Sequence, residues 1–264
     1  MSDNAARMSD GPSHSHHLDG FRRTVVVRPT QRRDEGQMTD QPGPLHVQYG
    51  AGWLAAAGWL NFDASPSLRL ERLPIVGRFL RLNERRFPDN ILFGDIVKGL
   101  PVKKGTVSSI YASHVLEHLC YDDFWRALTN TYEALKPGGV FRLIVPDLEA
   151  RARRYVKGAE EGDPDAAARF MRESYTGHES PARSLSQHIR RQLGNSAHRW
   201  MWDEPSMASA LSRTGFVNIR RCQLGDAEDQ AFSAVERADR FIDEATGVIE
   251  IAMECKKPPV TAND

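Results

Sequence analysis

The hydrophobic pattern is clearest between residues 108 and 147, where it predicts a strand, a helix and a second strand. Residues 108–113 form a short run with β-branched and aromatic members. Residues 140–145 (VFRLIV) are almost entirely apolar, as in a strand that is buried on both faces. Between the two runs, apolar side chains recur at helical spacing at Phe124, Leu128, Tyr132 and Leu135. A helix that joins two buried strands is typical of a crossover in a parallel sheet, so the pattern predicts an α/β fold.

The ends of this helix are marked by particular residues. Asp122 and Asp123 favour its start, because the N-terminus of a helix carries a partial positive charge. The segment 137–139 (Pro-Gly-Gly) predicts its end. Proline cannot extend the helical hydrogen bonds, and glycine adopts the left-handed conformation that ends helices.

The remaining elements extend the α/β series in both directions. Short strands are predicted at residues 46–49, 60–63, 91–93, 216–222 and 248–255. Residues 148–198 carry a helical pattern and are expected to form a cap or insertion after the fifth strand. Pro205 and Gly215 mark the limits of a further short helix. The series predicts a mainly parallel sheet of about seven strands.

Composition limits the number of domains and the kinds of partner. Residues 1–44 are polar and aperiodic, which predicts a disordered tail, and translation from Met38 would remove most of it. Residues 258–264 are expected to form a loose C-terminal tail, which leaves one domain at 45–257. The 35 basic and 35 acidic residues balance, so no net charge attracts nucleic acid. No apolar run approaches the roughly 20 residues that span a bilayer, and we expect a cytoplasmic protein of unassigned oligomeric state.

The cysteines give no sign of a disulfide framework. Cys120, Cys222 and Cys255 are odd in number, far apart and in no C-x-x-C spacing. We expect them to be reduced, packed thiols, as in a cytoplasmic protein.

Candidate binding residues follow the predicted strands. Residues 50–52 (Gly-Ala-Gly) follow the first strand, and Asp63 and Asp95 lie at the ends of the next two. Glycines let backbone amides come close to a ligand, and an acid at a neighbouring strand end can accept both hydroxyls of a ribose. A nicotinamide dehydrogenase shares these features. Its acid, however, lies about 20 residues after the glycines, whereas Asp63 lies 13 residues after Gly50 (63 − 50).

The order of these segments resembles that of the class I S-adenosylmethionine-dependent methyltransferases, in particular a bacterial subgroup with a short G-x-G…GWxNxD opening. The similar stretches are YGAGWLAAAGWLNFDAS (49–65), GDIVKGLP (94–101), SSIYASHVLEHL (108–119), LKPGG (135–139), LIVPDLE (143–149) and HRWMWDEPSMASALSRTGF (198–216). The resemblance covers residues 45–257. It implies a Rossmann-like, doubly wound sheet with an antiparallel C-terminal strand pair, and S-adenosylmethionine as the cofactor.

The resemblance also implies which residues bind the cofactor. They are Tyr49, Gly50, Ala51, Gly52, Asp63, Asp95, Ile96, Ser113 and His114. The glycine turn would lie against the methionine part, Asp63 would hold the ribose, and Asp95 with the backbone of Ile96 would meet adenine. Ser113 and His114 would line the place where methionine and substrate converge.

The sequence departs from the wider family at the first turn. Gln48 stands where an acid often precedes the glycines, which puts one contact to the cofactor's amino group in doubt. The third glycine of the longer signature is missing. Only residues 53–59 separate the first two strands, which is shorter than the dozen or so residues of an ordinary parallel crossover.

The segment 114–118 (HVLEH) supplies the catalytic candidates. His114 is the predicted general base, with Glu117 orienting it or His118. In a simpler interpretation, Glu117 and His118 only cap the turn. The segment also matches the H-x-x-E-H pattern of zinc peptidases, but that pattern requires one helix, and His114 follows a strand. We therefore predict no metal ligands.

His198, Trp200 and Trp202 are the candidate substrate-binding residues, because apolar walls with one polar group form acceptor pockets. The two tryptophans could equally belong to the core. The resemblance implies transfer to a small or medium acceptor at oxygen or nitrogen, with a sugar or glycoconjugate hydroxyl favoured. A methyltransferase fold that binds without turnover is the alternative.

Overall fold

The structure is a computed structural model that describes residues 43–73, 85–177, 180–181 and 197–260. The chain divides into two units, residues 1–35 and 36–264, and every described residue belongs to the second. The predicted N-terminal tail therefore lies outside the described residues except for its last two positions. Residues 178–179 and 182–196 of the predicted cap also lie outside them.

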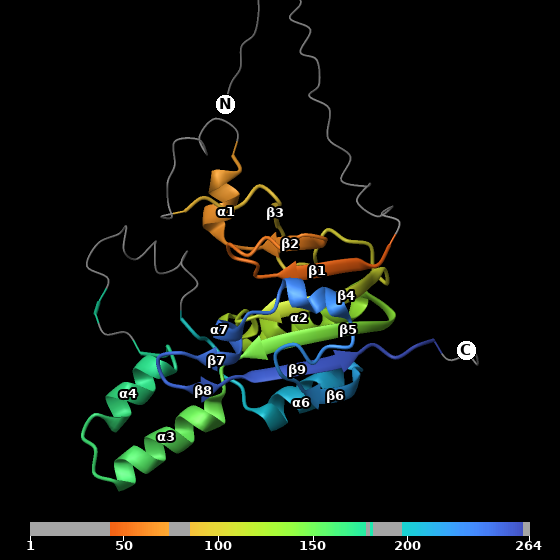
Figure 1. The fold of residues 1–264 in the computed structure, drawn as a ribbon. Coiled ribbons are helices and arrows are strands. Elements are labelled where there is room, and N and C mark those ends of the chain that lie inside the picture. Colours follow the sequence, from red (N-terminus) through yellow and green to blue (C-terminus); the bar gives the residue numbers. More distant parts are fainter. Residues whose placement is uncertain (1–42, 74–84, 178–179, 182–196, 261–264) are drawn as a thin grey trace, which may run out of the picture. The chain divides into compact units, whose positions relative to one another are not determined.

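A seven-stranded sheet forms the centre of the domain in the order β3-β2-β1-β4-β5-β9-β6 (Figure 1). Its strands are β1 (Leu45–Tyr49), β2 (Trp59–Asp63), β3 (Ile91–Phe93), β4 (Val107–Ser113), β5 (Leu135–Val145), β6 (Val217–Arg221) and β9 (Ile251–Lys256). Strands β1 to β5 pair in parallel, whereas β9 is antiparallel to both β5 and β6. The predicted Rossmann-like sheet with an antiparallel C-terminal strand pair is confirmed.

Short helices and one small hairpin complete the described fold. The helices are α1 (Pro66–Glu71), α2 (Tyr121–Ala134), α3 (Leu148–Glu160), α4 (Ala166–Glu173), α6 (Glu204–Thr214) and α7 (Ala238–Phe241), with 3-10 turns η2 (Leu116–His118) and η3 (Gln230–Ala234). Strands β7 (Ile242–Asp243) and β8 (Val248–Ile249) form a separate two-stranded sheet. None of the described helices is both long and apolar enough to cross a membrane.

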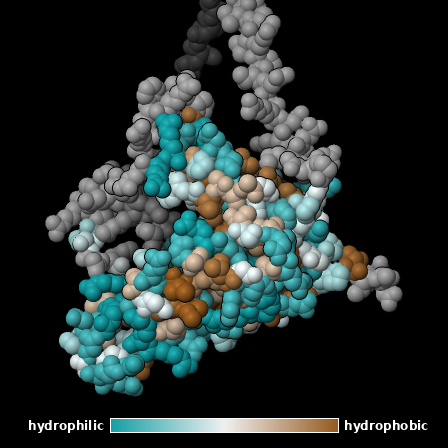
Figure 2. Space-filling view, in the orientation of Figure 1, coloured by the Kyte–Doolittle hydropathy of each residue, from teal (hydrophilic) through white to brown (hydrophobic). Residues whose placement is uncertain are grey.

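Two hydrophobic clusters cover the two faces of the sheet. On one face, α2 and α6 contribute Phe124, Leu128 and Leu211 to the main core. On the other, η3 and α7 contribute Phe232 and Phe241. The sheet is therefore buried on both sides, which explains why its central strands are almost entirely apolar. Outside these clusters, the β7–β8 hairpin exposes Ile242 and Ile249, where a hydrophobic patch is visible in Figure 2.

The helix α2 ends earlier than the sequence predicted. It stops at Ala134, and β5 begins at once with Leu135, which is buried and pairs with Val107. The segment 136–139 therefore lies within β5 instead of forming a separate turn. The register shifts between Leu135 and Val140, and Gly138 has φ +75°, so the Pro-Gly-Gly segment forms an irregularity in the strand.

The short connection between β1 and β2 is held by two buried amides. Gln48 Nε2 donates to the carbonyl of Leu54 at 2.6 Å, and Asn61 Nδ2 donates to the carbonyl of Ala56 at 3.1 Å. Gln48 Nε2 also donates to Asn61 Oδ1. These bonds satisfy backbone groups that a crossover helix would otherwise pair internally, so two parallel strands can be joined without a helix.

The last predicted strand is divided at Glu250. This buried side chain accepts two hydrogen bonds from Arg151 of α3, at 2.8 and 2.9 Å, and one from the backbone N–H of Asp147. The chain leaves the β7–β8 sheet at this residue and enters β9 at the next.

The three cysteines were expected to be reduced and packed, and the packing is confirmed for two of them. Cys222 and Cys255 are free and buried, but Cys120 is free and exposed at the start of α2.

Candidate functional site

The parallel strands bring the predicted cofactor residues to one edge of the sheet (Figure 1). Gly50 follows β1, Asp63 ends β2 and Ser113 ends β4, while Asp95 comes two residues after β3. The registers align these ends, since Tyr49 pairs with both Phe62 and Ala112. This carboxyl edge is where open α/β sheets bind ligands.

The glycine turn needs glycine for two different reasons. Gly50 has φ +67°, and a Cβ on it would lie 2.1 Å from Cγ2 of Val115. Gly50 therefore lets the turn pack closely against the segment that follows β4. Gly52 has φ +55°, and a Cβ there would meet nothing within 4 Å. At Gly52 the requirement is conformational, and the residue borders open space.

Asp63 ties the ends of two strands to their loops. Its Oδ2 accepts from the backbone N–H of Gly52 and its Oδ1 from that of Ser65, both at 2.8 Å. The residue is 8% exposed. A carboxylate has about four lone-pair sites, so two acceptor positions remain for other donors.

Asp95 caps the turn that follows β3. Its Oδ1 accepts from the N–H of Val97 at 3.0 Å, and its Oδ2 pairs with Lys98 at 2.9 Å. The carbonyl of Ile96 already accepts from Asn130 Nδ2 at 2.7 Å, and the Ile96 side chain is buried in the core.

A cavity of about 320 Å³ lies beside this turn. It is lined by Val97, Lys98, Trp125, Arg126, Thr129 and Asn130. None of the predicted site residues lines it, so it adjoins the predicted adenine-binding segment without including it.

Two of the predicted cofactor residues can offer only main-chain groups. The Tyr49 side chain lies in the core, and its hydroxyl accepts from Thr131 Oγ1 at 3.3 Å. Ala51 is buried, and its N–H donates to the carbonyl of Phe62. Burial raises the pKa of the Tyr49 hydroxyl. The phenol is therefore a structural group.

His114 sits in an unusual backbone conformation directly after β4. Its φ of +55° is uncommon for a residue with a side chain, and such positions cluster at functional sites. Its Nδ1 lies 3.4 Å from Oε1 of Glu117, and its Nε2 lies 3.0 Å from the carbonyl of Arg240. Burial by itself lowers the pKa of His114, but the nearby negative charge of Glu117 outweighs it and raises the pKa. Both ring nitrogens thus face acceptors, and a base role would require one to be released.

Ser113, beside it, has a buried hydroxyl with no hydrogen-bond partner among the described residues. The Tyr111 hydroxyl, two residues earlier on β4, lies close enough to interact with it, and burial raises the pKa of that phenol.

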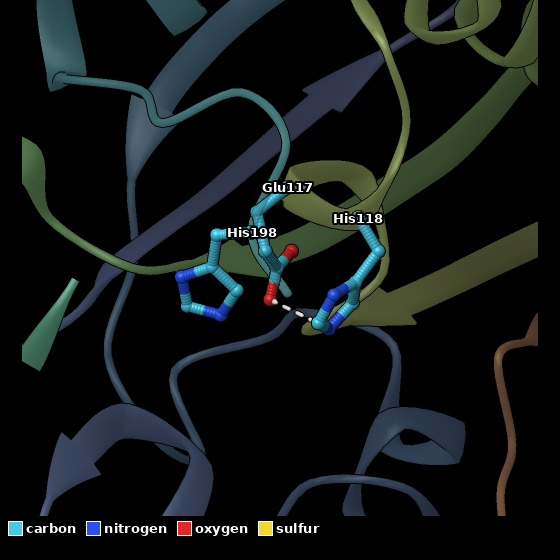
Figure 3. A group of neighbouring side chains, drawn as sticks. All are labelled: Glu117, His118 and His198. Atoms are coloured by element: carbon cyan, nitrogen blue, oxygen red, sulfur yellow. Dashed lines mark ion pairs between the residues drawn. The ribbon is translucent and has the colours of Figure 1, made fainter. Parts of the chain in front are cut away.

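Glu117, His118 and His198 form a second group (Figure 3). Glu117 and His118 belong to η2, and His198 belongs to a distant segment that docks through its backbone. The N–H groups of Arg199 and Trp200 donate to the carbonyl of Glu117 at 2.8 and 3.1 Å. Desolvation on burial lowers the pKa of His198 to about 4, so its imidazole is neutral at neutral pH.

The H-x-x-E-H segment does not have the geometry of a zinc peptidase. His114 follows a strand with a left-handed φ, and only residues 116–118 form a 3-10 turn. The two histidines of the motif therefore do not lie four residues apart on one α-helix, which is what that enzyme class requires.

The three predicted substrate-binding residues differ in their burial and in the groups they contact, although Trp200 and Trp202 both pack on Tyr121. His198 lies against His118, with ring centroids 5.1 Å apart. Trp200 is 44% exposed and packs on Tyr121. Trp202 is 4% exposed and packs on Phe124, with centroids 4.0 Å apart, as part of the main core. The core interpretation is therefore correct for Trp202.

Sequence reasoning missed two relationships at this edge. It did not pair Gly50 with Val115, and it did not bring His198 to Glu117. Both are tertiary contacts between segments far apart in the chain. The sequence indicated only that polar residues follow the strands and that His198 lies near two tryptophans. It did not indicate that the two groups meet.

A family described as "Methyltransferase domain" matches residues 52–221. The chain belongs to this family. The match runs from the glycine turn to the end of β6, so it includes Asp63, Asp95 and Ser113 at the edge described above. No curated protein matches the chain.

Several solved methyltransferase structures are similar to the chain. One is a chain of a Haloferax volcanii complex between the Trm112 methyltransferase activator and a methyltransferase, with 14% identity, a TM-score of 0.41, and coverage of 85% of this chain and 87% of that one. A SAM-dependent methyltransferase from Archaeoglobus fulgidus has 13% identity, a TM-score of 0.40, and coverage of 81% and 87%. A SAM-dependent methyltransferase from Thermotoga maritima has 16% identity, a TM-score of 0.40, and coverage of 82% and 84%.

Proposed function

We propose that the protein transfers a methyl group from S-adenosylmethionine to a small or medium acceptor, at oxygen or nitrogen, with a sugar or glycoconjugate hydroxyl favoured. The observation that carries the proposal is the methyltransferase-family match over residues 52–221. The strand edge supports it, because the residues expected to hold the cofactor gather there.

The residues present are compatible with the cofactor. Gly52 borders open space, and Asp63 retains two acceptor positions. In the proposal, the glycine turn holds the methionine part, Asp63 holds the ribose diol, and Asp95 with Ile96 meets adenine. Gln48 is committed to the β1–β2 loop, so the cofactor's amino group would need another partner.

Methyl transfer asks little of the protein once the cofactor supplies its activated methyl group. The site must bring the acceptor close, orient it, and in some reactions take a proton from it. The general-base role of His114, with Glu117 orienting it, stays a prediction. Trp200, which is partly exposed, remains a candidate to contact the acceptor.

The test combines binding with turnover. Calorimetry should show binding of S-adenosylmethionine and S-adenosylhomocysteine to the wild type, and a screen of acceptors with labelled cofactor should identify the product. Binding without transfer to any acceptor would favour the alternative, a non-catalytic module. Failure to bind either nucleoside would overturn the proposal.

A further inference from the structure

Glu117, His118 and His198 bring three potential metal ligands together. One ligand atom from each residue lies within 4.8 Å of the other two (Figure 3). The carboxylate of Glu117 projects between the two imidazole rings. The cluster lies beside the predicted catalytic histidine, since Glu117 also contacts His114.

The carboxylate of Glu117 lacks a full complement of partners. The residue is 0% exposed, and neither carboxylate oxygen accepts a hydrogen bond from a described residue. The nearest basic atoms are His114 Nδ1 at 3.4 Å and His118 Nε2 at 3.8 Å. Both distances exceed the roughly 2.7–2.9 Å of a charge-assisted hydrogen bond. A buried carboxylate is costly unless it is paired or binds a metal, and both oxygens of Glu117 remain open to a cation in addition to the two histidine contacts.

The two imidazoles each turn one ring nitrogen toward Glu117 (Figure 3). His118 Nδ1 donates to the carbonyl of Ala197 at 3.1 Å, so in the neutral ring Nε2 carries the lone pair. That nitrogen faces Glu117. His198 turns its Nε2 toward Glu117, whereas its buried Nδ1, which has no hydrogen-bond partner among the described residues, points away from the carboxylate (Figure 3). His118 thus gives one N–H to a backbone carbonyl and turns its other nitrogen toward Glu117, which is the arrangement found at metal sites.

We propose that Glu117, His118 and His198 bind one divalent transition-metal ion, with Zn²⁺ preferred over Mg²⁺. Two imidazoles and one carboxylate suit zinc, whereas Mg²⁺ favours oxygen ligands alone. Bonds of about 2.0–2.1 Å place tetrahedral ligands roughly 3.4 Å apart, so no pair in the cluster has to close by more than about 1.5 Å. Three protein ligands leave the fourth coordination position of a tetrahedral metal ion for water or for a group of the acceptor.

The proposed set differs from the one that the H-x-x-E-H pattern suggested. In that pattern His114 and His118 would be the two histidines. Here His114 gives its Nε2 to the carbonyl of Arg240 and keeps its Nδ1 3.4 Å from Glu117, and the second histidine of the proposed set is His198. The inference does not depend on the proposed function, because metal binding is measured without cofactor or acceptor.

The test is a metal titration of the full-length chain in which His14, His16 and His17 are replaced by serine, since tail histidines bind metals adventitiously. The metal-free protein is titrated with Zn²⁺, Co²⁺ and Mg²⁺, and bound metal is counted by elemental analysis. We expect one equivalent of Zn²⁺, absorption bands of protein-bound Co²⁺, and no saturable binding of Mg²⁺.

Substitutions of single ligands then locate the site. Glu117→Gln, His118→Asn and His198→Asn should each weaken Zn²⁺ binding by at least about 10-fold, the effect of losing even an outer-shell partner. His46→Asn, a partly buried histidine away from the cluster, should bind as the parent does. Circular dichroism checks that each variant is folded. If the buried Glu117→Gln variant does not fold, the Zn²⁺ affinity of His198→Asn tests the proposed site. Absence of stoichiometric Zn²⁺ binding, or binding unchanged in folded His198→Asn, would overturn the proposal.

Discussion

Asp63 accepts a hydrogen bond from the backbone N–H of Gly52 at 2.8 Å, and this bond joins the end of β2 to the turn that follows β1. The other carboxylate oxygen accepts from Ser65, at the start of the next loop. One buried acid thus fixes two loops of the edge where the cofactor is proposed to bind. It does so while keeping acceptor positions for a diol.

Asp63→Asn should weaken the binding of S-adenosylmethionine. Hydrogen bonds to a charged group contribute about 1.5–3 kcal/mol, which corresponds to roughly 10-fold to 100-fold in affinity. The amide oxygen can still accept from Gly52, so the fold should persist. Calorimetry measures the affinity, and Asp89→Asn, a surface aspartate paired with Arg72, is the matched control. Equal affinity in wild type and Asp63→Asn would remove Asp63 from the ribose role.

Gly50→Ala should destabilise the fold more than Gly52→Ala. Both positions have a positive φ, which costs an alanine about 1–2 kcal/mol. Only Gly50 adds a clash, because its Cβ would lie 2.1 Å from Val115 Cγ2. Overpacking of this kind costs about 1–3 kcal/mol more. Urea unfolding measures the difference. In the background of Val115→Ala, the extra cost of Gly50→Ala should shrink; if it does not, the close approach is not its cause.

Trp200 and Trp202 should respond differently to substitution. Trp202→Ala removes a buried ring from the main core and should cost about 3–5 kcal/mol of unfolding free energy. Trp200→Ala removes a partly exposed ring and should cost much less. If Trp200 contacts the acceptor, its loss should raise the acceptor KM while the stability stays near that of the wild type. Comparable destabilisation by the two substitutions would contradict the assignment of Trp202 alone to the core.

Asp226 forms ion pairs with Arg142 and Arg220, and these should make the free energy of unfolding depend on pH below about pH 4. Burial by itself would raise the pKa of Asp226. Hydrogen bonds from Arg220, the backbone of Gln223 and Arg142 outweigh it and lower the pKa to about 2. Because the folded pKa lies below the unfolded one, the stabilisation is present above about pH 4 and is lost as the pH falls toward 2.

Asp226→Asn isolates this contribution. The wild type should be more stable than the variant at pH 6, and the gap should narrow as the pH falls from about 4 to 2, where the aspartate becomes protonated. Chemical unfolding across this range measures it. A gap that stays constant over the range would show that the aspartate charge does not contribute.

The sequence predicted the strands because each of them leaves a local pattern of apolar and turn residues. Residues 140–145 are apolar throughout because both faces of β5 are covered, and Gly215 ends α6 at φ +105°. The positions of Gly50, Asp63 and Asp95 followed from the same pattern, since parallel strands align their carboxyl ends. By contrast, the segment 137–139 was expected to form a turn after the helix, whereas it lies within β5, because Leu135 is buried and pairs with β4 directly after α2.

What the sequence by itself determined is the fold and the sheet edge where the candidate binding residues gather, because hydrophobic periodicity and turn residues act on neighbours in the chain. Only the tertiary structure decided which distant side chains meet. Trp202 is buried in the core, and Trp200 is exposed at the surface. His198 lies beside Glu117 because the next two residues donate backbone hydrogen bonds to η2. Such contacts depend on how separate segments dock, and no local pattern encodes that.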